Sequence, residues 1–151
     1  MLQLLVTLAL LLLASIANAC DTDLECQIVE HRAKNAVSAR ELALEIQQVA
    51  ASLDIDPKLL AAMVLHESRG VERAYNPTGD HGLTQINTRT AIDFGISVKC
   101  LYNWRCNLRK GAELFAKNRP CLYNLGRYRV LTGKFVDMCH TYEAKLYALV
   151  D

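Results

Sequence analysis

The sequence predicts a mainly α fold, built as one domain and stapled by disulfides. Amphipathic helical patterns with recognisable start and stop signals fill most of residues 38–151. No repeat, low-complexity tract or linker rich in Pro and Gly divides that stretch, and 151 residues is the usual length of a single domain. The chain also carries six cysteines, an even number that favours disulfide pairing.

The first predicted helix starts at Ser38. The Ser38 side chain can accept a hydrogen bond from the Glu41 amide while the Glu41 side chain reaches back to the serine amide, which is the capping-box pattern. Behind this start, apolar residues recur at helical spacing. They are Leu42, Ile46, Val49, Ala50 and Leu53. We therefore expect an amphipathic helix with one buried face.

The second predicted helix is the most apolar part of the domain. Asp56 and Pro57 fit its N-cap and first helical positions. From Leu59 to about Ser68 the residues are apolar on nearly every side, which is typical of a helix in the centre of a domain. Gly70 is a favourable terminator because glycine tolerates the left-handed backbone that ends many helices.

The rest of the domain is predicted to add two helices and little or no sheet. Turn-forming residues fill 75–80, where we expect a small hairpin. Helical patterns return at 107–118 and again near the C-terminus. Their inward residues are Leu108, Gly111, Ala112 and Phe115 in the first, and Tyr142, Leu146, Leu149 and Val150 in the second.

Residues 1–19 are predicted to be a secretory signal peptide. Residues 4–14 are almost unbroken Leu, Ala and Val without charge, and Ala17-Asn18-Ala19 forms a small-residue cleavage site. The run is too short to span a bilayer about 30 Å thick comfortably, although an uncleaved anchor is the alternative. Cleavage after Ala19 would leave an N-terminal extension, 20–37, and the domain, 38–151, in the periplasm or outside the cell.

The cysteines stand at positions 20, 26, 100, 106, 121 and 139, so all of them survive this cleavage. An even count behind a signal peptide indicates disulfides formed in an oxidising compartment. Six thiols allow fifteen pairings, and the sequence does not decide among them. Zinc is disfavoured because no C-x-x-C occurs and Cys139-His140 stands alone. Cys20 at the cleavage point also admits lipidation, which would leave an odd number of thiols.

Basic residues concentrate between Lys99 and Lys134, where nine occur against one acid, Glu113. The ordinary explanation for this concentration of basic residues is that they lie on solvated faces of helices. The alternative is a surface that attracts an anionic polymer.

Glu67 is the candidate catalytic acid. It lies at the predicted C-terminal end of the apolar helix, where the helix dipole and low-dielectric neighbours both disfavour a carboxylate and raise its pKa. A carboxyl group kept protonated in this way can act as general acid on a glycosidic oxygen. The alternative is a surface residue that merely ends a helix. A metalloprotease H-E-x-x-H site is excluded because position 70 is Gly, and His66 is expected to be structural.

Three ordered motifs resemble those of the soluble lytic transglycosylase family. The chain has E-S-R at 67–69, G-L-T-Q-I-N at 82–87 and L-Y-N-L-G at 122–126, where the family carries E-S, G-L-M-Q and A-Y-N. The spacing from Glu67 to Gly82 and the helix opening at 107–112 are also similar. The resemblance covers about Ser38 to Gly126. It implies a lysozyme-like fold, α+β with a minimal β hairpin.

The resemblance implies a reaction on the β-1,4 bond from N-acetylmuramic acid to N-acetylglucosamine in peptidoglycan glycan strands. Glu67 would protonate the leaving oxygen and then take the proton of the muramic 6-hydroxyl as a 1,6-anhydro ring closes without water. In this family the substrate's N-acetyl group is thought to do the work of a second carboxylate. That agrees with a sequence in which the nearby acids, Asp80 and Asp93, are expected at the surface.

The resemblance also assigns substrate-binding residues. They are Ser68, Gly82, Gln85, Asn87, Tyr123 and Asn124. Ser68 would orient Glu67, although from the residues alone an ordinary residue at the end of a helix is an equally good interpretation. Gly82 would let the backbone approach closely, and Gln85 would bind polar groups of the sugar. Tyr123 would position the Glu67 carboxyl through its hydroxyl and Asn124 would support the cleft, whereas from the residues alone Tyr123 is a core aromatic.

Two departures from the family pattern carry expectations of their own. Thr84 replaces the usual Met and is expected to reshape a subsite. The stretch before Tyr123 is shorter than usual, and Cys121-Leu122 replaces small residues there. We predict a Cys121–Cys139 disulfide that staples this segment and a second one between Cys100 and Cys106.

Three other functions compete with the transglycosylase. One is a muramidase that adds water, as goose-type lysozymes do on a related fold. Another is a non-catalytic glycan-binding factor within a secretion or pilus machine, which would have no need for the acid. The third is a disulfide-rich inhibitor or toxin-like module, which the long apolar helix disfavours. For the transglycosylase we expect a monomer without cofactor, metal or nucleic acid, which could serve a secretion, conjugation or pilus machine.

Overall fold

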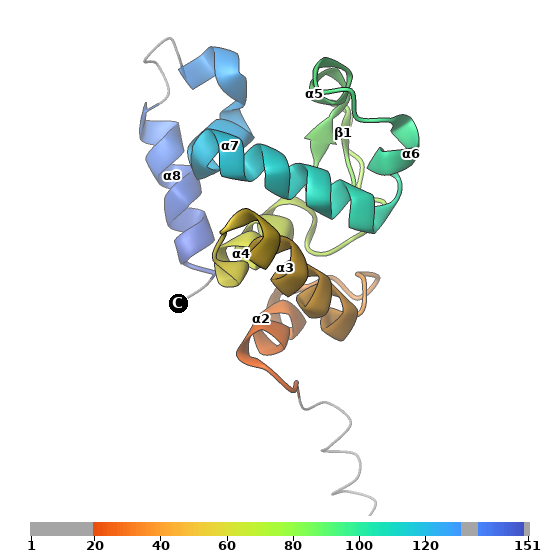
Figure 1. Cartoon of the computed structure of the whole chain (residues 1–151). Coiled ribbons are helices and arrows are strands. Elements are labelled where there is room, and N and C mark those ends of the chain that lie inside the picture. The colour runs from red at the N-terminus through yellow and green to blue at the C-terminus, as the bar shows by residue number, and fades with distance from the viewer. Residues whose placement is uncertain (1–19, 131–135, 150–151) are drawn as a thin grey trace, which may run out of the picture.

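The computed structural model describes residues 20–130 and 136–149, with side chains except those of 118–140 and 143. The helices of this part are α2 (Asp23–His31), α3 (Ala39–Leu53), α4 (Pro57–Ser68), α5 (Thr88–Asp93), α6 (Val98–Leu101), α7 (Trp104–Val130) and α8 (Val136–Tyr147). The strands are β1 (Asp80–His81) and β2 (Ile86–Asn87). The predicted mainly α fold with one small hairpin is confirmed (Figure 1).

Helix α4 is the centre of the core, as its sequence predicted. The Asp56 carboxylate accepts a hydrogen bond from the Lys58 amide at 2.8 Å, and Pro57 occupies the first turn. Every residue from Leu60 to Leu65 is buried. The helix packs against α2, α3 and α8 (Figure 1). Because residues 60–65 are buried, the packing of the neighbouring helices fixes the position of the last turn of α4.

The segment before residue 38 belongs to the same core. Helix α2 buries Leu24 and Ile28 against α3 and α4. A disulfide joins Cys20 to Cys26 at its first turn, and this bond takes the Cys20 sulfur that lipidation would require. The predicted boundary at residue 38 therefore does not coincide with a break in packing.

The predicted capping box at the start of α3 is wrong. Ser38 is the N-cap residue, but its side chain makes no cap hydrogen bond. Backbone bonds instead hold the preceding segment to the end of α4: the Val37 amide donates to the Gly70 carbonyl at 2.9 Å. The Glu41 side chain lies near Arg105, 3.7 Å away. Tertiary contacts thus replace a local pattern that the sequence favoured.

The hairpin lies slightly later in the chain than predicted. Strands β1 and β2 are antiparallel and pair Asp80 with Asn87 and His81 with Ile86. Besides Asp80, the predicted stretch 75–80 contributes one isolated bridge, from Tyr75 to His81. The turn between the strands is therefore the segment 82–85, which is the G-L-T-Q motif.

Helix α7 is longer than the predicted 107–118. Leu108, Ala112 and Phe115 are buried as predicted, but the helix runs on through Pro120 to Val130. A proline inside a helix removes one hydrogen bond and bends the axis. Figure 1 shows such a change of direction where the ribbon passes from cyan to blue. Within α8, Tyr142 and Leu146 are buried as predicted.

The predicted Cys100–Cys106 disulfide is present and joins α6 to the start of α7. The side chains of Cys121 and Cys139 lie outside the described residues, so their pairing stays a prediction. Among the described helices, none has the length and apolar character needed to cross a membrane. The described side chains also contain no cluster of three or more His, Cys, Asp or Glu that could hold a metal ion.

The cysteine pairing predicts that the mature protein has no reactive thiol. Alkylation without reductant should leave the intact mass unchanged, and alkylation after reduction should label all six cysteines. Mass spectrometry of protein purified from the periplasm checks both. Three or more cysteines labelled without reductant would contradict the disulfide framework.

Candidate functional site

The Glu67 side chain lies at the last turn of α4, half-buried, and meets α8 there. The Tyr142 hydroxyl donates a hydrogen bond to Glu67 Oε1 at 2.8 Å. Tyr142 is only 4% exposed, so its ring is fixed by packing and its hydroxyl has little freedom. A buried tyrosine hydroxyl needs a partner, and here that partner is the candidate acid.

His66 completes this small group. Its ring meets the Tyr142 ring edge-on, with centroids 5.1 Å apart. Burial, together with the nearby charge of Lys145, lowers the pKa of His66, so its imidazole is neutral at neutral pH. His66 therefore supports Tyr142 by packing and adds no positive charge beside Glu67, in keeping with the structural role expected from the sequence.

Ser68 is buried at the end of α4, where its hydroxyl serves the helix terminus. It donates to the Val64 carbonyl at 3.1 Å and accepts from the Gly70 amide at 3.2 Å. Arg69 then takes a left-handed conformation, φ 53°, and Gly70 follows at φ 78°. These two residues turn the chain directly after Glu67, and Ser68 stabilises that turn.

The loop 82–85 is held by its own side chains. Gln85, at φ 49°, donates from Nε2 to the Gly82 carbonyl at 3.0 Å and to the Ala74 carbonyl at 3.3 Å. Its Oε1 accepts from Asn76 at 3.3 Å. The Gln85 amide therefore shapes the loop from inside, and the predicted contact of this residue with a sugar stays a prediction.

Asn107 is the hub that anchors this loop to α7. It is fully buried, and its Oδ1 accepts from the Thr84 amide at 3.0 Å and from the Thr84 hydroxyl at 2.8 Å. Its Nδ2 donates to the carbonyls of His81 at 2.9 Å and Leu101 at 3.2 Å. Gly82, at φ 76°, is required here because a Cβ would collide with the Asn107 side chain.

The same contacts show how Thr84 is placed, and its predicted effect on the shape of a subsite stays a prediction. Its side chain is fully buried, bonds to Asn107 and packs on Gly111, where a Cβ would overlap it. Thr84 therefore does not line a subsite directly. It replaces the family's Met as part of the internal support of the loop.

The Asn107 hub predicts a large loss of stability on substitution. Asn107→Ala should lower the free energy of unfolding by about 3 kcal/mol, because buried partners lose their hydrogen bonds. Urea unfolding followed by circular dichroism measures the change. Asn35→Ala, at an exposed asparagine, should change it by less than about 0.5 kcal/mol. Equal effects from the two variants would contradict the hub.

Asp80 is more enclosed than the sequence led us to expect. One oxygen accepts from Asn76 at 2.7 Å and from Thr78 at 2.8 Å, and the other accepts from Asn87 at 2.7 Å. Burial opposes the charge, but these three bonds and the nearby His81 outweigh it and lower the pKa of Asp80. Asp80 is therefore an ionised carboxylate at the base of the hairpin.

Asn87 is part of the hydrogen-bond network around Asp80. Its Nδ2 also donates to the Thr78 carbonyl at 3.1 Å, and its Oδ1 accepts from the Arg89 amide at 3.0 Å as the N-cap of α5. Asp93, the other acid considered, is exposed on α5.

The structure brings some predicted site residues together and leaves others open. Gly82, Gln85 and Asn87 share the hairpin, and Glu67 and Ser68 share the end of α4. Tyr123 and Asn124 lie on α7, and their side chains are outside the described residues. Sequence reasoning missed Tyr142 as a neighbour of Glu67. The available signal was a tyrosine on the inward face of the last helix, since a buried hydroxyl must find a partner.

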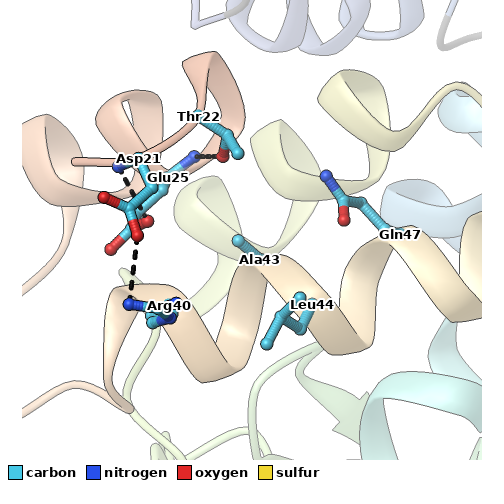
Figure 2. A pocket seen from close by; sticks show the side chains of 7 residues that line it. All are labelled: Asp21, Thr22, Glu25, Arg40, Ala43, Leu44 and Gln47. Atoms are coloured by element: carbon cyan, nitrogen blue, oxygen red, sulfur yellow. Dashed lines mark hydrogen bonds and ion pairs between the residues drawn. The ribbon is translucent and has the colours of Figure 1, made fainter.

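A shallow pocket of about 90 Å³ lies elsewhere, between the first turn of α2 and α3 (Figure 2). Its lining residues are Asp21, Thr22, Glu25, Arg40, Ala43, Leu44 and Gln47. An ion pair of 3.0 Å between Arg40 and Asp21 closes one side. Its volume is far below the several hundred cubic ångströms typical of ligand sites. We therefore do not place substrate there.

Part of the basic run is neutralised on the surface. Arg105 lies 3.2 Å from Glu45, and Lys110 lies 2.8 Å from Glu113. Both pairs are partly exposed and therefore contribute little stability, but they reduce the positive field. For these two residues the ordinary explanation, solvated helix faces, is the better one.

A central apolar helix with a glutamate in its last turn, followed by a small hairpin, defines a class of lysozyme-like domains. The chain belongs to the transglycosylase SLT domain family, whose model matches residues 45–129, more than half of its length. The match contains Glu67, the hairpin and most of α7. Family membership supports a lysozyme-like fold and an activity of the lytic transglycosylase type on peptidoglycan. The comparisons with curated proteins and with solved structures gave no match.

Proposed function

We propose that this protein is a peptidoglycan lytic transglycosylase that uses Glu67 as its catalytic acid. It would cut the bond from N-acetylmuramic acid to N-acetylglucosamine and leave a 1,6-anhydro end. The observation that carries the proposal is the half-buried Glu67 carboxyl at the end of α4, oriented by the Tyr142 hydroxyl. The family match supports the substrate class.

One carboxyl group can perform both proton transfers. In its acid form Glu67 gives a proton to the bridging oxygen as the bond to the anomeric carbon breaks. As a carboxylate it then takes the proton of the muramic 6-hydroxyl, whose oxygen attacks the anomeric carbon and closes the anhydro ring. The acid form of Glu67 is restored and no water is consumed. Tyr142 keeps the carboxyl in one orientation through both steps.

The loop 82–87 would form the neighbouring wall of the glycan site. Its internal bonds, through Gln85, Asn87 and Asn107, fix the backbone before substrate arrives. Such pre-organisation lowers the cost of binding. Ser68, Gln85 and Asn87 would then act mainly by holding this wall, and Tyr123 and Asn124 would complete it from α7.

We also propose that the protein works in the periplasm or outside the cell. The Cys20–Cys26 and Cys100–Cys106 disulfides support an oxidising compartment. The small size of the chain is compatible with service to a secretion, conjugation or pilus machine that must pass the wall, by analogy with other small members of the family.

A muramidase is the second candidate, and the Asp80 network is the observation that favours it. A hydrolase of the two-carboxylate type needs an ionised group to steady the cation or hold water. Asp80 is ionised and held by three side chains, which suits that task.

The products and an Asp80 variant together separate the two candidates. If Glu67 works alone, Asp80→Asn should retain at least about a third of the wild-type rate, and the muropeptides should end in anhydro sugars, one water lighter than hydrolysed ends. Mass spectrometry of the digest and turbidity of a peptidoglycan suspension measure these outcomes. Asn76→Ala is the matched control, because it removes the bonds of Asn76 to Asp80 and to Gln85 but leaves the charge of Asp80.

Hydrolysed ends in the wild-type digest, together with a collapse of activity in folded Asp80→Asn but not in Asn76→Ala, would support the muramidase. Circular dichroism establishes that each variant is folded.

A further inference from the structure

Three aromatic rings gather on one face of the hairpin, which we call the aromatic face. The His81 ring contacts those of both Tyr75 and Tyr102, with centroids 5.1 Å and 5.4 Å away. The two tyrosines are 64% and 52% exposed, whereas His81 is 8% exposed. Two tyrosine rings therefore rest on a buried imidazole and face solvent.

The aromatic face is distinct from the polar network around Asp80. Successive side chains of a strand point to opposite sides, so Asp80 and His81 face in opposite directions. Tyr75 forms a bridge with His81 and lies on the same side as its ring. Asn87, paired with Asp80, lies on the other side. The hairpin thus has one polar and one aromatic face.

The His81 ring and the backbone that carries Tyr102 are anchored. His81 Nε2 lies 3.0 Å from the Thr88 hydroxyl. Tyr102 stands inside the short segment closed by the Cys100–Cys106 disulfide, directly after Leu101, whose carbonyl accepts from Asn107. A backbone anchored in this way loses little conformational entropy when a ligand covers the rings. Large exposed side chains that gather on a fixed surface mark a binding site.

We propose that the aromatic face is a second glycan-binding surface, on which Tyr75 and Tyr102 stack against sugar rings of a peptidoglycan strand away from the bond that is cut. The identity of the polymer rests on the proposed function. A pyranose ring offers an apolar CH face bordered by hydroxyls, and a tyrosine offers an apolar ring with a polar tip. The same hairpin carries the loop 82–85. A glycan strand bound on the aromatic face would therefore stay close to the proposed glycan site.

The test measures binding to insoluble peptidoglycan sacculi in a Glu67→Gln background, so that the polymer is not cut. The Tyr75→Ala/Tyr102→Ala double variant should bind at least about tenfold more weakly, as for loss of an aromatic anchor. The Tyr75→Phe/Tyr102→Phe variant should bind within about twofold of the parent, because stacking needs the ring and not the hydroxyl. Tyr147→Ala is the matched control: this tyrosine is 53% exposed on α8 and should have no effect.

Salt separates stacking from attraction by the basic run. The tenfold difference between parent and double alanine variant should persist from low to high NaCl, whereas an electrostatic contribution would fade. Equal sacculus binding by the parent and a folded double alanine variant would overturn the proposal and would leave the face to a protein partner. Failure of the proposed function would appear separately, as cleavage by Glu67→Gln.

Discussion

Glu67→Gln should abolish cleavage of peptidoglycan while leaving the fold intact. The amide has the shape of the acid and can still accept from the Tyr142 hydroxyl through its oxygen, but it cannot give a proton to the glycosidic oxygen. Loss of a general acid costs at least about 10²-fold in rate, and Glu67 would serve both proton transfers. Turbidity of a peptidoglycan suspension and release of muropeptides measure the loss.

Glu72→Gln is the matched control for this experiment. Glu72 lies five positions further along, is partly exposed, and pairs only loosely with Arg73 at 3.6 Å. Its substitution should leave the rate within about twofold of wild type. A folded Glu67→Gln variant that still clears peptidoglycan at a rate near wild type would contradict the assignment of Glu67.

Local sequence signals were sufficient where they agreed with burial. Helix α4 was predicted from Asp56, Pro57 and an unbroken apolar run, and each of these features decides structure within a few residues. The same holds for the inward face of α7 up to Phe115. The helical pattern was predicted only to residue 118, but the helix continues through Pro120 to Val130. A proline removes one hydrogen bond, and neighbouring turns can carry the helix past it.

Long-range contacts account for what the sequence could not predict. The capping box at Ser38 was lost because Val37 bonds to Gly70, thirty-three positions away. The hairpin strands have two residues each, too few to show the alternation that identifies a strand. The Tyr142–Glu67 bond joins residues seventy-five positions apart. No spacing in the sequence encodes that contact, although the inward position of Tyr142 was predicted.

Tyr142→Phe should slow cleavage by about 10- to 100-fold with little change in stability. Phenylalanine keeps the buried ring and its contact with His66, so the free energy of unfolding should change by less than about 1.5 kcal/mol. The Glu67 carboxyl loses a donor that fixes its orientation, and a hydrogen bond to a charged group contributes about 1.5–3 kcal/mol. We expect the loss in kcat rather than in KM, because Tyr142 acts on the acid and not on the sugar.

A positioning role for Tyr142 has a signature that simple packing does not. The hydroxyl donates to the carboxylate form, so its removal should move the limb of the pH–rate profile that reports on Glu67 to higher pH. Tyr147→Phe, an exposed tyrosine on the same helix, should change neither rate nor profile. A Tyr142→Phe enzyme with the wild-type rate and an unmoved profile would show that the hydrogen bond seen here does not act in catalysis. Orientation of Glu67 would then fall to another side chain, of which Tyr123 on α7 is the first to test.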